Sequence, residues 1–188
     1  MPDWQEIIDR DGKAVWQTAY RLLGNRADAD ECFQEAFLAA LEVSRREEVR
    51  NWRALLQRLA TARAVDRLRS RYRQGSQQRP EDWDALPGPA PTASQIVEDS
   101  ELSDWLSGAL ACLPPRQAEV FCLHCLEDWS YREIAQHLAI TVDSVGVLLH
   151  RARKQLRELF DASSKSLSGA AGNPAVSHGS SISRQEPP

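Results

Sequence analysis

The feature that most constrains this chain is a helical pattern from Val142 to Leu159, preceded by a shorter amphipathic segment that begins at Ser130. In the longer segment apolar residues recur at steps of three, four and seven, which places one buried stripe along a helix. Ser130 and Glu133 have the spacing of a capping box, which predicts that a first helix runs from here through Leu138. The sequence therefore predicts two consecutive helices, a short one followed by a longer one.

The connection between these segments predicts a helix-turn-helix. Ala139 and Ile140 turn the chain, and Thr141 caps the second helix. Many helical proteins contain such a pair without touching DNA, so the deciding feature is the basic exposed face of the second helix, since Lys and Arg supply most of the affinity for the phosphate backbone. That face carries Ser144, His150, Arg151, Arg153, Lys154 and Arg157, and the core between the helices is expected from Ile134, Ala135, Leu138, Ile140 and Val145.

A net charge of -4 is unexpected for a DNA-binding chain, but the charges are distributed unevenly along the sequence. Residues 50–73 hold eight arginines and one acid, whereas residues 80–115 hold seven acids and no Lys or Arg. With 188 residues the chain is long enough for one ordinary domain or two small ones. No apolar run approaches the roughly 20 residues that span a bilayer, and the start lacks the basic region of a signal peptide. We therefore expect a cytoplasmic protein without membrane insertion.

The rest of the chain predicts two helical units. Helices are expected over Trp4–Leu23, broken at Gly12, then from near Asp28, and over Asn51–Arg73. The last of these has a core stripe but almost no acids to pair with its arginines, which favours contact with nucleic acid over an ordinary solvated face. Two further helices are expected from Ile96 to Cys112 and from Arg116 to Leu126, with Pro115 at the first position of the latter.

These segments define an all-α fold with two small helical domains. Residues 1–73 form the first domain, a Pro-rich acidic stretch at 74–95 forms a flexible linker, and residues 96–160 form the second domain with the helix-turn-helix. Residues 161–188 include eight serines and little to bury, which predicts a disordered tail.

Four stretches resemble the small extracytoplasmic-function (ECF) type of RNA polymerase sigma factor, within the sigma-70 family. "AYRLLGNRADADECFQEAFLAAL" is similar to the family segment that binds the polymerase core, and "NWRALLQRLATARAVDRLRSRYR" to the segment that melts and reads the -10 element. "LPPRQAEVF" and "SYREIAQHLAITVDSVGVLLHRARKQLREL" resemble the domain that reads the -35 element. They occur in the family's order and spacing across residues 4 to 160.

The resemblance implies a role for the residues of each stretch. It implies that the core polymerase, through its clamp helices, is bound by Asp30, Glu31, Gln34, Glu35 and Phe37. It implies that the -10 element is bound by Trp52, Arg53, Arg63, Asp66, Arg67, Arg69 and Arg71. It implies that the -35 element is bound by Arg132, Thr141, Ser144, Val147, Leu148, His150, Arg151, Arg153 and Lys154. The partners implied are core polymerase (clamp helices and flap), promoter DNA and an anti-sigma factor.

The recognition helix departs from the family pattern. Where the family usually has a basic residue, a serine and a second basic residue, this chain has Gly146, Val147 and Leu148. Losing two contacts of about 1 to 3 kcal/mol each would weaken the -35 readout. The alternatives are apolar contacts, such as Val147 with a thymine methyl, or greater dependence on the -10 domain and the polymerase.

Other function classes were weighed against the sigma-factor hypothesis. No nucleophile with a base, phosphate-cradling glycine loop or paired carboxylates stand out, so we expect neither an enzyme nor a small-molecule substrate, and no cofactor. A helix-turn-helix regulator acting alone leaves the arginine helix unexplained. A thiol or zinc sensor would use Cys122, Cys125 and a histidine, but a second ligand pair at zinc spacing is missing, so no metal site is expected.

Overall fold

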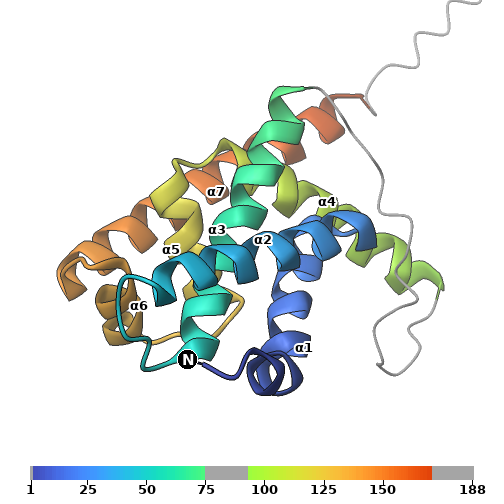
Figure 1. Ribbon diagram of the computed structural model, residues 1–188. Helices are drawn as coiled ribbons and strands as arrows, with labels where there is room; N and C mark the ends of the chain where they lie inside the picture. The colour runs from blue at the N-terminus through green and yellow to red at the C-terminus, as the bar shows by residue number, and fades with distance from the viewer. Residues whose placement is uncertain (1, 75–92, 171–188) are drawn as a thin grey trace, which may run out of the picture.

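A computed structural model describes residues 2–74 and 93–170 (Figure 1). Within these ranges the chain is helical and contains no strand, which confirms the all-α prediction. The helices are α1 (Trp4–Leu23), α2 (Arg26–Ser44), α3 (Trp52–Arg73), α4 (Ala93–Cys112), α5 (Pro115–Cys125), α6 (Tyr131–Leu138) and α7 (Val142–Ala170). Most of the predicted linker, residues 75–92, and the tail from residue 171 lie outside the described residues.

Side-chain caps set the limits of the first three helices. The Asp3 carboxylate accepts hydrogen bonds from two backbone N–H groups of α1, and Asn25 and Asn51 cap α2 and α3 in the same way. Gly24, at φ 69°, ends α1 in the left-handed conformation that glycine adopts without strain. The predicted break at Gly12 was wrong. This glycine lies inside an unbroken helix, where a Cβ atom would be 3.6 Å from the Phe33 ring.

The second unit also follows its local signals closely. Pro115 is the first residue of α5, as predicted, and both hydrogen bonds of the Ser130–Glu133 capping box are present. The predicted start of α4 at Ile96 and start of the disordered tail at residue 161 need correction, because α4 begins at Ala93 and α7 continues to Ala170. Neither Pro nor Gly interrupts the chain between residues 147 and 168, so nothing stops the helix once packing has established it.

The two units pack against each other, which the sequence did not predict. Helix α3 lies centrally (Figure 1) and contacts α1 and α2 on the one hand and α4, α5 and α6 on the other. One buried cluster joins Val65 and Leu68 of α3 to Leu110 and Leu113 of the second unit. The helix-turn-helix has its own cluster around Ile134, whereas a third cluster lies within the first unit around Leu56.

Candidate nucleic-acid interface

The helix-turn-helix is held by short polar contacts at both helix starts. The Glu133 carboxylate accepts a hydrogen bond from the Ser130 N–H at 2.8 Å, and Thr141 Oγ1 accepts one from the Ser144 N–H at 3.1 Å. Ala139 turns the chain in the left-handed conformation at φ 52°. Ile134 and Val145 are fully buried between the helices and fix their relative position. The second helix of the pair is thereby a rigid element with one face free.

Most residues predicted to read the -35 element lie on that free face. The side chains of Ser144 and Leu148 are half-buried, and Leu148 packs partly against the cluster beneath α7. Its packing leaves only part of the side chain accessible to a ligand. The exposed members of the predicted set are Arg132, Thr141, Val147, His150, Arg151, Arg153 and Lys154.

The arginines of α3 fall into two groups that the sequence did not distinguish. Arg53 and Arg63 are exposed, as is Asp66, so they are accessible to a partner. Trp52 is half-buried with its ring 5.1 Å from the Trp4 ring. The second group has intramolecular partners: Arg69 donates to the Leu113 carbonyl, and Arg71 donates to the Leu23 carbonyl at 3.1 Å.

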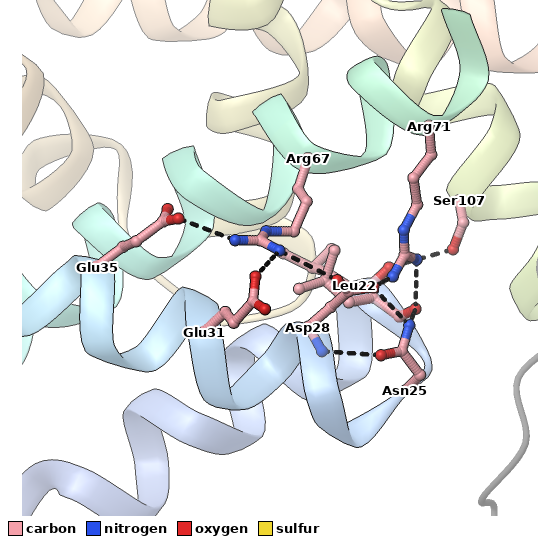
Figure 2. A network of polar contacts seen from close by, with 9 residues as sticks. Leu22, Asn25, Asp28, Glu31, Glu35, Arg67, Arg71 and Ser107 are labelled. Carbon is pink, nitrogen blue, oxygen red and sulfur yellow. Dashed lines mark hydrogen bonds and ion pairs between the residues drawn. The ribbon is translucent and has the colours of Figure 1, made fainter. Parts of the chain in front are cut away.

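Arg67 belongs to the second group and is held by a network of carboxylates (Figure 2). Its guanidinium is 3.1 Å from an oxygen of Asp28, 2.5 Å from one of Glu31 and 2.8 Å from one of Glu35, all on α2. Burial opposes the charged form, but the hydrogen bonds that Arg67 donates to Glu31 and Glu35 outweigh it and raise the pKa of Arg67. Asp28 also forms an ion pair with Arg71. The structure therefore joins residues predicted for two different partners.

The residues of α2 that were predicted to bind the polymerase also fall into an exposed group and a group with partners inside the molecule. Asp30 and Gln34 are exposed, although Asp30 accepts a hydrogen bond from the Trp16 indole N–H at 2.7 Å. Phe37 packs with Phe33, the ring centroids 4.6 Å apart, and is half-buried. Sequence reasoning missed Leu38, whose side chain is 64% exposed one turn beyond Gln34. Its position outside the apolar stripe of α2 was the signal that could have identified it.

A buried carboxylate lies where the two units meet. Glu127 Oε1 accepts a hydrogen bond from Arg21 Nη2 at 3.0 Å, and its Oε2 accepts one from Gln57 Nε2 at 2.9 Å. Arg21 also donates to the Leu126 carbonyl at 3.1 Å. Burial raises the pKa of Glu127 despite the attraction of Arg21. Helices α1 and α3 are thus tied to the turn after α5 by one side chain.

The cysteines and histidines do not form a site in the part of the chain that the structure describes. No group of three His, Cys, Asp or Glu side chains lies close enough there to hold a metal ion. Cys122 is buried, and burial raises the pKa of its thiol well above the ordinary value, whereas Cys125 is exposed. His124 and the Trp129 carbonyl are 2.8 Å apart, so the histidine has a structural partner. A raised thiol pKa disfavours the reactive thiolate that a redox sensor needs.

Among the described helices, none is both long and apolar enough to cross a bilayer.

Comparison with known proteins supplies the family. Residues 7–74 match the model for sigma-70 region 2, and residues 103–156 match the model for sigma-70 region 4. The chain is 34% identical over 158 residues to the ECF RNA polymerase sigma factor SigE of Mycolicibacterium smegmatis, covering 84% of this chain and 62% of that protein. It is 29% identical over 168 residues to the ECF RNA polymerase sigma factor SigW of Bacillus subtilis, covering 81% of this chain and 86% of the relative.

A solved structure shares the fold. The sigma factor RpoE from Bartonella quintana, crystallised in complex with the anti-sigma factor NepR, matches with a TM-score of 0.53 at 20% identity, over 86% of this chain and 98% of that one. Both sigma-70 regions therefore occur in one chain, in sequence order, on a helical fold that a known sigma factor also has. The chain belongs to the sigma-70 family of RNA polymerase sigma factors and is similar to ECF members of that family.

Proposed function

We propose that this protein is a transcription initiation factor that docks on core RNA polymerase, recognises -10 and -35 promoter elements and promotes DNA melting. The observation that supports it most directly is the presence of sigma-70 regions 2 and 4 in one chain, the second built around a helix-turn-helix with an exposed basic face. The factor supplies binding energy and no bond-making chemistry of its own. Such a role places the protein in the cytoplasm, with the polymerase and the DNA.

The exposed side of α2 is the proposed contact with the polymerase clamp helices. Asp30, Gln34 and Leu38 offer an acidic group, an amide and an apolar side chain within about two helical turns. Such a mixture suits a specific protein interface, in which an apolar centre is surrounded by polar groups. Glu31 and Glu35 belong to the same surface, but both form ion pairs with Arg67, so we expect them to contribute less to polymerase binding.

The proposed -10 contact uses the free cations of α3. Arg53 and Arg63 can bind phosphates or stack on unpaired bases, and Trp52 supplies an aromatic surface next to Arg53 at the start of α3. Arg67, Arg69 and Arg71 are already bound within the molecule. For these three the prediction of DNA contact requires that their partners exchange when the complex forms.

The proposed -35 contact is the free face of α7. A recognition helix enters the major groove with its first turns against base edges and its later cations near phosphates. Ser144 and Val147 occupy the early turns, and Arg151 and Lys154 the later ones. An anti-sigma factor is a further proposed partner, because the related fold was crystallised with one and because the α2 and α7 surfaces would both be blocked by a protein bound across them.

Run-off transcription with purified core polymerase and a library of promoter fragments tests the proposal. We expect initiation that requires this protein at fragments sharing a motif pair, together with capture of the protein by core polymerase. Arg151→Ala should lower initiation by roughly tenfold without lowering core binding, since one lost contact costs about 1–3 kcal/mol. Arg157→Ala, also exposed on α7 but two turns farther along, is the matched control.

The alternative outcomes separate the rival functions. Binding to duplex DNA with neither core binding nor initiation would identify a helix-turn-helix regulator that acts alone. Equal loss in Arg151→Ala and Arg157→Ala would show that positive charge along α7 matters but that Arg151 makes no specific contact of its own.

A further inference from the structure

The free face of α7 is not smooth, because it carries a shallow hollow at its N-terminal end. Tyr131 of α6 forms one side, and α7 supplies Val142, Gly146, Val147, His150 and Arg151. The volume of the hollow is about 490 Å³, and its lining is mostly apolar. Val142 and Val147 are 44% and 49% exposed, so two β-branched side chains present apolar surface beside the hollow. Tyr131 packs against the cluster around Ile134, whereas Val142 and Val147 leave much of their apolar surface uncovered.

Gly146 is the residue that keeps the hollow open. Glycine weakens a helix relative to alanine, and among the described glycines only Gly24 has the positive φ that glycine alone adopts easily. A Cβ atom at position 146 would lie 3.7 Å from Cε2 of Tyr131, an ordinary contact distance. Alanine would therefore fit without a clash and fill the floor of the hollow. Neither backbone conformation nor crowding explains the glycine, which suggests that the open space has a use.

The charges around the hollow indicate what it faces. Asp143 lies at its edge, and a carboxylate there repels a DNA phosphate. His150 and Arg151 lie one to two turns farther along α7, where cations can hold the flanking backbone. On the proposed function, this arrangement of charges would set the hollow against base edges and the cations against the flanking phosphates. In the major groove the apolar group that a base pair offers is the 5-methyl group of thymine.

We propose that the hollow around Gly146 receives the 5-methyl group of a thymine in the upstream promoter element, with the Tyr131 ring and Val147 against it. The inference rests on the proposed function and adds a base preference to it. It also gives the departure from the family pattern at Gly146 and Val147 a positive role, since an apolar hollow replaces polar contacts. Asp143, at the edge of the hollow, is placed to accept a hydrogen bond from the amino group of a neighbouring adenine or cytosine.

Promoter fragments in which one thymine at a time is replaced by deoxyuridine test this directly. Deoxyuridine keeps every hydrogen-bonding group and lacks only the methyl group. Holoenzyme assembled from this chain and core polymerase is bound, in competition with the unmodified fragment, to a promoter at which initiation requires the protein. Loss of one buried methyl corresponds to about a fourfold weaker binding, so we expect that change at one upstream position.

The variant Gly146→Ala should reduce that discrimination to less than about 1.5-fold, because its methyl group occupies the space of the thymine methyl. Gly108→Ala is the matched control, since Gly108 is also helical and its Cβ would meet no atom within 4 Å. It should keep the fourfold effect. A thermal midpoint of Gly146→Ala at or above that of wild type shows that the variant is folded, and deoxyuridine in the downstream element should affect both variants equally.

Two results would overturn the inference in different ways. If initiation requires the protein but no upstream deoxyuridine changes binding by more than about twofold, or if Gly146→Ala keeps the full discrimination, the hollow does not read a thymine methyl. If no fragment shows initiation that depends on the protein, the proposed function fails, and the base preference fails with it.

Discussion

Replacing Arg67 by methionine should destabilise the protein, because its guanidinium forms ion pairs with three carboxylates of α2. Methionine keeps an unbranched apolar stem that can pack as the arginine stem does, and it removes only the charged group. In the variant Asp28, Glu31 and Glu35 lie on one helix face with Arg71 as their remaining close cation. The perturbation therefore isolates the electrostatic contribution that ties α2 to α3.

The exposure of each carboxylate sets the size of the effect. The Glu31 and Glu35 side chains are 63% and 45% exposed, so solvent screens them and each pair contributes about 0.5–1 kcal/mol. Asp28 and Arg67 are both 21% exposed, but Asp28 keeps Arg71 as a partner, so this pair adds about 1 kcal/mol. We expect Arg67→Met to lower the free energy of unfolding by about 2–3 kcal/mol in total.

Urea unfolding followed by far-ultraviolet circular dichroism measures this free energy. Arg63→Met is the matched control, because Arg63 lies on the same helix, carries the same charge and is exposed. It should cost no more than about 0.5 kcal/mol. Raising the salt concentration to 1 M shortens the screening distance to about 3 Å, so the difference between the two variants should shrink by about 1 kcal/mol.

Equal stability of Arg67→Met and Arg63→Met would refute the reasoning, as would a difference that salt leaves unchanged. The double variant Arg67→Met, Glu35→Gln refines the test, since the two residues should couple by about 0.5–1 kcal/mol. If Arg67 instead binds the -10 element, Arg67→Met would impair transcription at temperatures where it remains fully folded. The predicted DNA contact of Arg67 would then be supported separately from its structural role.

Three further predictions follow from other parts of the fold. Ser130→Ala removes the cap of α6 and should lower the free energy of unfolding in urea by about 1 kcal/mol, and unchanged unfolding would contradict a stabilising cap. Leu123→Ala opens a cavity beneath the helix-turn-helix, where Leu123 is fully buried, and should cost about 2–5 kcal/mol; a loss below 1 kcal/mol would contradict this packing. Glu127→Gln tests the buried carboxylate. Burial raises the pKa of Glu127 in the folded protein above the unfolded value near 4.5, so the folded protein holds the proton more tightly. The free energy of unfolding should therefore fall as pH rises from 4.5 through the folded-state pKa. The glutamine variant should lack that part of the pH dependence, and a wild-type contribution from Glu127 that grows with pH over this range would show that the pair with Arg21 dominates.

Much of the fold could be predicted because its signals are local. The capping box at Ser130, the proline at the start of α5 and the glycine after α1 each act within one helical turn, so a few neighbouring residues specify them. The break predicted at Gly12 failed because intrinsic propensity is weak beside tertiary packing. There, α1 gains a close approach to the Phe33 ring of α2.

The candidate site was only partly predictable, since the sequence shows which residues are charged and not which charges are free. Arg63 and Arg67 look alike on a helix with almost no acids of its own, yet one is exposed and the other is bound by α2. Leu38 could have been found from its position outside the apolar stripe of α2. Gly146 and Val147 were noted as a departure from the family pattern, but the hollow was not, because Tyr131 of α6 forms one side of it. Exposure of an apolar group depends on which neighbours cover it.

The helices, their caps, the helix-turn-helix and the sigma-70 resemblance could all be recognised from local sequence, because helical periodicity and capping are set by side chains a few positions apart. Which cations of α3 are available, and how the two units meet, depends on tertiary packing. Those outcomes depend on contacts such as Arg67 with Glu35, 32 positions apart, and Gln57 with Glu127, 70 positions apart. Such pairs form only when packing brings the helices together, since no local signal in either segment encodes its distant partner.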